Sequence, residues 1–235
     1  MKYRHVLLLI LALLSFRMST QAVEQRADDS LWTAEFPVEK GELSADGRNP
    51  YFILEPGDQS VFAAGGERLT ITVLDETKVV DGVQTRVVEE RETRDGKLIE
   101  VSRNYFAISR RTNSVFYFGE EVDLYKEGKV IGHEGAWLAG AKGARFGLMM
   151  PGQVLLKGRY FQEMAPGVAM DRAEIVSLKE AVTTVSGNFT DCIKVEETTP
   201  LEPRAREYKY YARGIGLVQD GSLKLVKHER ITPAK

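Results

Sequence analysis

The sequence has 235 residues, of which 43% are hydrophobic and 28% are charged, and its formal net charge at pH 7 is −2. Positive and negative residues are interspersed without a basic cluster, which argues against a nucleic acid or an anionic membrane surface as the partner. Cys192 is the only cysteine, so no intrachain disulfide can form and a packed core must hold the fold together.

The first 22 residues have the features of a cleaved export signal. A basic start precedes an apolar run of nine residues from Val6 to Leu14, and Thr20 and Ala22 follow it. An uncleaved anchor is disfavoured because a membrane-spanning helix needs about 20 apolar residues. We predict cleavage after Ala22 and a periplasmic or extracellular protein with no membrane span in its mature chain. Its net charge would be −5, because three of the 32 basic residues and none of the 34 acidic residues precede the cleavage point.

Residues 23–50 are polar and show no sustained periodicity, so we expect a lead-in that is partly disordered. Residues 51–235 are predicted to form a single β domain, because short turn signals separate runs of β-favouring residues. These signals are Asp81-Gly82, Asp95-Gly96, Glu127-Gly128, Ser186-Gly187-Asn188 and Asp220-Gly221. The pattern predicts an all-β fold, an antiparallel meander of about ten strands that forms a barrel or a strongly curved half-barrel, with a sandwich as the alternative.

Hydrophobic alternation supports the strands. Leu69, Ile71 and Val73 alternate with threonines, which is typical of a half-buried strand. The stretch 115–118, Val-Phe-Tyr-Phe, is apolar or aromatic at every position. We expect this strand either to be covered on both faces or to form the wall of a ligand cavity.

The segment from His133 to Gly152 is rich in glycine and alanine and is predicted to be the one long loop of the domain. Its apolar side chains require a surface to cover, so the loop either caps the end of the core or acts as a lid over a cavity. A cap predicts that Trp137 is buried, whereas a lid predicts that it is exposed and mobile. Lys142 and Arg145 interrupt the apolar residues and exclude a membrane span.

Several segments together resemble a known group of proteins. They are Y-F-I-L-E-P-G from Tyr51, V-L-D-E-T-K-V-V-D-G-V from Val73, P-L-E-P from Pro200 and Y-K-Y-Y-A-R-G-I-G-L-V from Tyr208. The set is similar to an uncharacterised family of exported bacterial all-β proteins, although Ile53 stands where that family has proline. The resemblance implies export and a single domain, and it supplies no catalytic residues. At the level of fold only, the chain also resembles lipoprotein-carrier half-barrels, in which a curved sheet surrounds an apolar cavity.

Residues for metal or nucleophilic chemistry are present without a diagnostic pattern. His133 and His228 show neither zinc nor copper ligand spacing, so we predict no metal and no cofactor. Cys192 is either an inert buried thiol or a nucleophile assisted by one of the histidines. No nucleophile-elbow motif occurs in the sequence, and no catalytic residue is assigned.

The favoured hypothesis is an extracytoplasmic binding or carrier-type protein, without catalysis, for an apolar, lipid-like or amphipathic small molecule. The candidate cavity wall and lid residues are Phe116, Phe118, Trp137, Phe146, Met149, Met150, Tyr160, Phe161 and Tyr210. One alternative is an exported hydrolase that uses acids such as Glu120, Asp123 or Glu134. Another is a structural or interaction module of the cell envelope, with a filled interior and an exposed apolar patch or sheet edge.

Overall fold

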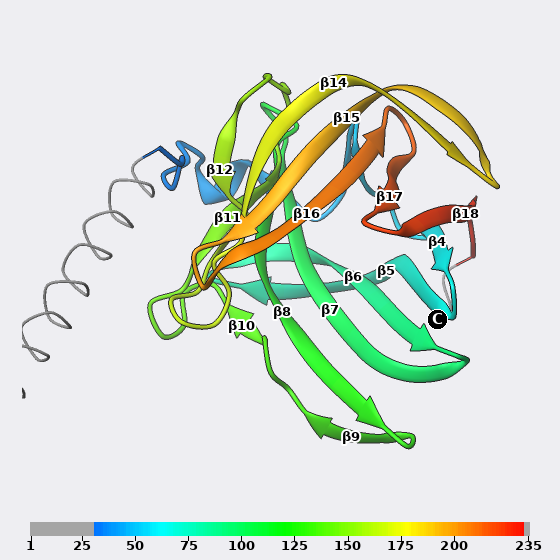
Figure 1. Ribbon diagram of the computed structural model, residues 1–235. Helices are drawn as coiled ribbons and strands as arrows, with labels where there is room; N and C mark the ends of the chain where they lie inside the picture. The colour runs from blue at the N-terminus through cyan, green and yellow to red at the C-terminus, as the bar shows by residue number, and fades with distance from the viewer. Residues whose placement is uncertain (1–30, 233–235) are drawn as a thin grey trace, which may run out of the picture. The chain divides into compact units, whose positions relative to one another are not determined.

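The computed structural model describes residues 31–232, and the domain discussed below begins at Ala34. The predicted export signal and the first part of the predicted lead-in lie outside the described residues. Figure 1 shows that almost all of the domain is β structure. Among the described residues, no helix is long and apolar enough to cross a membrane.

One short 3₁₀ helix, η1 (Lys40–Glu42), precedes the strands. The strands are β1 (Leu43–Ser44), β2 (Gly47–Asn49), β3 (Phe52–Leu54), β4 (Asp58–Ala64), β5 (Glu67–Val80), β6 (Val83–Arg94), β7 (Lys97–Ser109), β8 (Val115–Lys126), β9 (Lys129–Gly132), β10 (Trp137–Leu138), β11 (Arg145–Met150), β12 (Arg159–Phe161), β13 (Glu163–Met164), β14 (Arg172–Thr184), β15 (Gly187–Thr199), β16 (Glu202–Ala212), β17 (Gly216–Asp220) and β18 (Leu223–Arg230).

Sixteen of these strands form one sheet, and β2 and β3 form a separate hairpin. The main path runs β12-β14-β15-β16-β17-β18-β4-β5-β6-β7-β8-β11-β13, while β1 pairs with β7 and both β9 and β10 pair with β8. The sheet is antiparallel, nearly closed and barrel-shaped, which confirms the predicted fold class. Its two ends, β12 and β13, are separated in the chain only by Gln162, so the connection brings the edges together. Gly147 on β11 allows this approach, because a Cβ there would collide with the carbonyl oxygen of Gln162.

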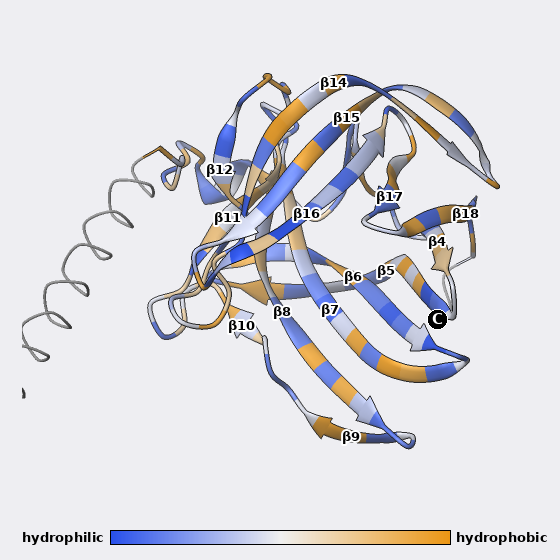
Figure 2. Cartoon of the chain, viewed as in Figure 1, coloured by the Kyte–Doolittle hydropathy of each residue, from blue (hydrophilic) through white to orange (hydrophobic). Residues whose placement is uncertain are grey.

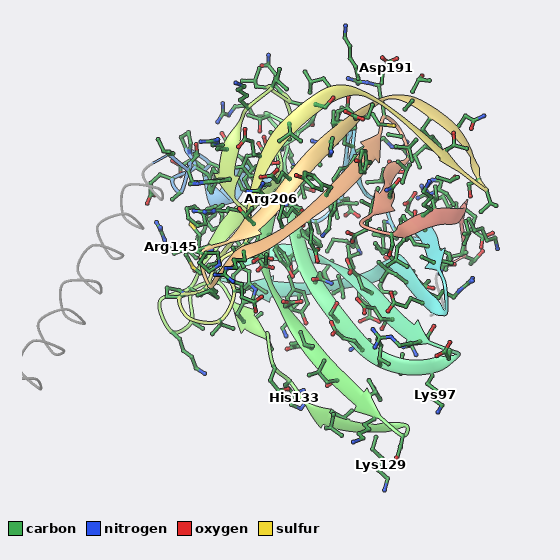
Figure 3. All side chains as sticks on the ribbon, in the orientation of Figure 1. Lys97, Lys129, His133, Arg145, Asp191 and Arg206 are labelled. Atoms are coloured by element: carbon green, nitrogen blue, oxygen red, sulfur yellow. The ribbon has the colours of Figure 1, made fainter. Side chains whose placement is uncertain are left out.

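The predicted turns connect the long strands. Asp81, Asp95 and Glu127 have φ angles of 50°, 50° and 53°, and the glycine after each also has positive φ. Two successive residues with positive φ define the type I′ turn that matches the twist of a two-residue hairpin. Lys97 and Lys129 mark the tips of the β6–β7 and β8–β9 hairpins and point away from the sheet (Figure 3).

Hydrophilic and hydrophobic residues alternate along β7 and β8 (Figure 2), so each strand presents one face to the barrel interior. The stretch 115–118 departs from this pattern and is 0–5% exposed. Tyr117 stacks on Phe106 at 4.6 Å between ring centroids, whereas Phe118 stacks on Phe146 at 4.9 Å. The prediction that this strand is covered on both faces is therefore confirmed.

The segment from His133 to Gly152 is more regular than predicted. It contains β10 and β11, which both pair with β8, so the expectation of one long loop was wrong. Pairing is possible because Gly119 adopts a φ of 120° and lacks the Cβ that would collide with the carbonyl oxygen of Trp137. Trp137 is 6% exposed and packs edge-to-face on Tyr117, as the cap interpretation expects.

Part of the predicted polar lead-in also belongs to the domain. Leu43 and Ser44 form β1 against β7, and residues 47–49 form β2. Asn49 is completely buried, and its side-chain amide donates hydrogen bonds to the carbonyl oxygens of Asn113 and Pro151. The polar composition of this segment predicted exposure, but a polar side chain such as that of Asn49 can be buried when its hydrogen bonds are satisfied.

Candidate functional site

The candidate site is a cavity inside the barrel, with a volume of about 100 Å³. It lies between the wall formed by β4–β7 and the wall formed by β16 and β17, and we call it the interior cavity. Its apolar lining includes Phe62, Leu69, Ile71, Val73, Val88, Phe106 and Leu217, and its charged lining consists of Asp58, Glu90, Lys209 and Asp220. The cavity therefore combines an extensive apolar surface with a small charged region, which is typical of ligand sites.

Strand alternation places the apolar lining. Leu69, Ile71 and Val73 occupy alternate positions on β5 and all line the interior cavity. On β6 the cross-strand partner of Val73 is Val88, and the partner of Ile71 is Glu90. Glu90 therefore places a carboxyl group beside the apolar side chains of Ile71 and Val88.

The charged region is centred on Lys209 of β16. Its Nζ lies 2.8 Å from Glu197 Oε2 and 3.8 Å from Asp220 Oδ2. Burial alone would lower the pKa of Lys209, but the carboxylates of Glu197 and Asp220 raise it well above the ordinary value. Gln162 Nε2 donates a hydrogen bond of 3.0 Å to Glu197 Oε1 and fixes that carboxylate from the other side. Lys209 is therefore protonated, and its positive charge is compensated by the carboxylates of Glu197 and Asp220.

Acids outnumber cations in the interior. Burial raises the pKa of Glu90 to about 7, although the charge of Lys209 opposes the shift. Burial and then the charge of Glu90 raise the pKa of Glu120 to about 7. The pKa of Glu163 is also raised well above its ordinary value, by burial and then by the charges of Asp171 and Glu120. These carboxyl groups destabilise one another because opposite charges in their surroundings are few.

In the domain, between Ala34 and residue 232, two buried polar side-chain atoms have no hydrogen-bond partner among the described residues, the hydroxyl of Tyr160 and the Nε1 of Trp137. Tyr160 is 4% exposed, and both burial and the charge of Glu197 raise its pKa, which places the ring near the charged region. An unsatisfied buried polar atom is uncommon and costs about 1 to 3 kcal/mol. Tyr160 itself does not line the interior cavity.

A second polar arrangement lies at the wall formed by β4. Ser60 Oγ is 3.0 Å from His228 Nδ1, and His228 Nε2 is 3.8 Å from Asp58 Oδ2. Ser60 and Asp58 both line the interior cavity. Burial raises the pKa of Asp58, while the charge of His228 opposes the shift. The three side chains could therefore transfer a proton between serine and histidine.

The structure separates the residues that were predicted to form one cavity wall. Phe116, Phe118 and Phe146 pack together, with centroid distances of 5.7 and 4.9 Å from Phe146 to the other two rings. Of the nine predicted residues, Met149 is the one that lines the interior cavity. Trp137, Met150, Tyr160 and Phe161 are buried in the core.

Tyr210 lies on the other face of β16 from Lys209 and Tyr211. Its ring lies 5.5 Å from Lys194 Nζ and packs against a second buried cluster, which includes Cys192 and Ala212.

The acids considered for hydrolysis are also separated. Glu120 lies toward the interior, whereas Asp123 pairs with His133 at 3.0 Å on the surface and Glu134 is exposed. Cys192 is completely buried, and its pKa is raised by burial, which favours the inert interpretation of this thiol.

Sequence reasoning missed Glu90, Lys209 and Asp220. A signal was present for two of them, because Glu90 shares the parity of Val88 and Lys209 that of Tyr211. A charge on the apolar face of a strand indicates a functional or ion-paired position. In comparisons with known proteins, no family model, curated protein or solved structure matches the chain.

Proposed function

We propose that the protein is a binding or carrier-type protein, without catalysis, that takes a small apolar or amphipathic molecule into the interior cavity. The observation that carries this proposal is the cavity itself, which lies inside a nearly closed sheet and has a mainly apolar lining. Burial of a ligand's hydrocarbon part against such a lining contributes about 25 cal/mol per Å². The rigid strands on both sides also support a pre-formed site, which reduces the entropy lost on binding.

The test is a titration with hexan-1-ol, a small amphipathic molecule, followed through the amide NMR spectrum. We expect saturable shifts at residues that line the cavity, such as Ile71, Val88 and Tyr211. An Ile71→Phe variant should weaken binding by about tenfold or more, because the larger side chain occupies the cavity. The matched control is Val79→Phe, since Val79 lies on the same strand and is 69% exposed.

Two results would contradict the proposal. One is the absence of saturable shifts in the unmodified protein. The other is equal binding by the unmodified protein and a folded Ile71→Phe variant, because the ligand would then occupy another part of the molecule.

We propose further that the protein acts outside the cytoplasm, in the periplasm or beyond the cell. This part is supported by the sequence of residues 1–22 alone. Mass spectrometry of the protein from its own host should find a mature chain that begins at Val23. A chain that still begins at Met1 and stays in the cytoplasm would contradict export.

The Ser60–His228–Asp58 arrangement supports a hydrolase as the second candidate function. His228 could accept the proton of the Ser60 hydroxyl while Asp58 stabilises the imidazolium that forms. A fluorophosphonate probe should then label the protein at Ser60, and a Ser60→Ala variant should lose the label while Ser177→Ala keeps it. Absence of labelling at Ser60 would contradict the hydrolase function.

A further inference from the structure

We propose that the ligand of the interior cavity carries a positively charged amine, which binds beside the carboxylates of Glu90 and Asp220 while its hydrocarbon part packs on the apolar lining. This inference rests on the proposed binding function and names the head group of the ligand.

The lining itself has an excess of negative charge. Asp58, Glu90 and Asp220 face one cation, Lys209. That cation lies 2.8 Å from Glu197, which is adjacent to the cavity, so much of its charge is already compensated. Within residues 31–232, Glu90 makes no ion pair closer than 4.0 Å. A carboxylate beside apolar side chains and without an ion-pair partner is a favourable position for a ligand's cation.

Further acids interact with Glu90, directly or through one another. Glu90 raises the pKa of Glu120, and Glu120 in turn raises that of Glu163, so the three carboxyl groups interact electrostatically. Asp171 adds to the same set through its effect on Glu163. Like charges in a partly buried space destabilise one another, and a bound cation would relieve that repulsion.

The lining also supplies hydrogen-bond acceptors for a charged head group, because Glu90 and Asp220 both line the interior cavity. An ammonium group donates three hydrogen bonds and accepts none. Two carboxylates, with four oxygen atoms between them, supply the acceptors that such a group requires.

The apolar lining indicates an organic cation instead of a bare ion. Leu69 and Ile71 lie on β5, which pairs with β6, and Phe62 lies on the next strand, β4. Leu217 of β17 adds to the apolar lining. A methylene group gains about 0.8 kcal/mol when it is buried on such a surface, which an inorganic ion cannot use. The cavity volume of about 100 Å³ suits a short alkyl chain.

The test compares three ligands of equal chain length, hexylamine, hexan-1-ol and hexanoate, titrated into the mature chain at pH 8. At this pH the amine is protonated, since amines of this kind titrate near pH 10.4, and Glu90 is ionised because its pKa is about 7. We expect hexylamine to bind at least about tenfold more tightly than hexan-1-ol, and hexanoate to bind most weakly. The amide NMR spectrum gives the affinity and reports whether each protein is folded.

Variants then locate the head group. Glu90→Gln and Asp220→Asn should each reduce the preference for the amine over the alcohol by about tenfold, because each removes one negative acceptor. Glu76→Gln, which changes an exposed glutamate of β5, should preserve it. A preference that is unchanged in both folded interior variants would overturn the assignment to these carboxylates.

The ligand series separates the two proposals. If hexan-1-ol binds saturably but hexylamine binds no more tightly, the amine inference is wrong and the binding function stands. If none of the three ligands binds saturably, both are overturned.

Discussion

Replacement of Glu90 by glutamine should stabilise the protein at alkaline pH and have little effect at acid pH. Burial raises the pKa of Glu90 from 4.5 to about 7, against the attraction of Lys209 and with small contributions from Asp220, Glu92 and Glu100. The folded protein therefore holds this proton more tightly than the unfolded chain does. The resulting stability is fully present below pH 4.5 and is lost as the pH rises through about 7.

The size of the effect follows from the two pKa values. A pKa of about 7 in place of 4.5 corresponds to about 3 kcal/mol of unfolding free energy once Glu90 is ionised in both states. Glu90 is half-buried, and solvent in the cavity screens its charge, so we expect about 2 kcal/mol. At pH 8.5 the Glu90→Gln variant should exceed the unmodified protein in stability by this amount. At pH 4 the two should agree within about 0.5 kcal/mol, because Glu90 is then largely protonated in both the folded and the unfolded state, and protonated glutamic acid and glutamine are both neutral.

The assay is urea denaturation at pH 4 and pH 8.5, followed by circular dichroism. Asp220, Glu92 and Glu100 also have raised pKa values, in each case first because of burial, so the unmodified protein itself should lose stability over this range. The difference in unfolding free energy between the Glu90→Gln variant and the unmodified protein at each pH gives the contribution of Glu90 alone. Glu76→Gln should show no pH-dependent difference. The reasoning is refuted if Glu90→Gln destabilises the protein equally at both pH values.

Three further perturbations test other parts of the structure. Lys209→Met should lower the unfolding free energy at pH 8 by about 3 kcal/mol, because Glu197 and Asp220 lose their buried cation. Unchanged stability in urea denaturation would contradict the ion pairing of Lys209 with these two acids. Gly119→Ala should lower the stability more than Gly128→Ala does. Both glycines have positive φ, but only a Cβ at position 119 would collide with backbone atoms. Equal midpoints of thermal unfolding for the two variants would contradict the β8–β10 pairing. Leu11→Arg should interrupt the apolar run of the predicted signal and leave an unprocessed precursor, and normal processing on an immunoblot would argue against a signal at this position.

Much of the fold could be predicted because it depends on local chemistry. Asp81-Gly82 and Asp95-Gly96 identify their hairpins, since the turns require residues that accept positive φ. The number of strands was harder to predict from the sequence, because two- and three-residue strands such as β10 and β12 form only by pairing with strands elsewhere in the chain. For the same reason the segment around Trp137 was taken for a loop, although Gly119 of β8 provides the space in which it pairs.

The candidate site was harder to predict, and Tyr210 shows why. Alternation on β16 groups Tyr208 with Tyr210 and Lys209 with Tyr211, but it does not indicate which pair faces inward. Hydrophobicity favoured the two tyrosines as cavity residues, whereas in the structure Lys209 faces inward because Glu197 and Asp220 compensate its charge. That Glu90 lies across the same cavity depends on closure of the whole sheet, which no local pattern encodes.

Native mass spectrometry of the protein purified from its own host tests the central claim, ligand binding in the interior cavity, most directly. The account predicts a bound small molecule that carries an amine, dissociates on unfolding and is absent from the Ile71→Phe variant but present in Val79→Phe. A protein of unmodified mass without any bound species, combined with no saturable binding of hexylamine or hexan-1-ol, would contradict it.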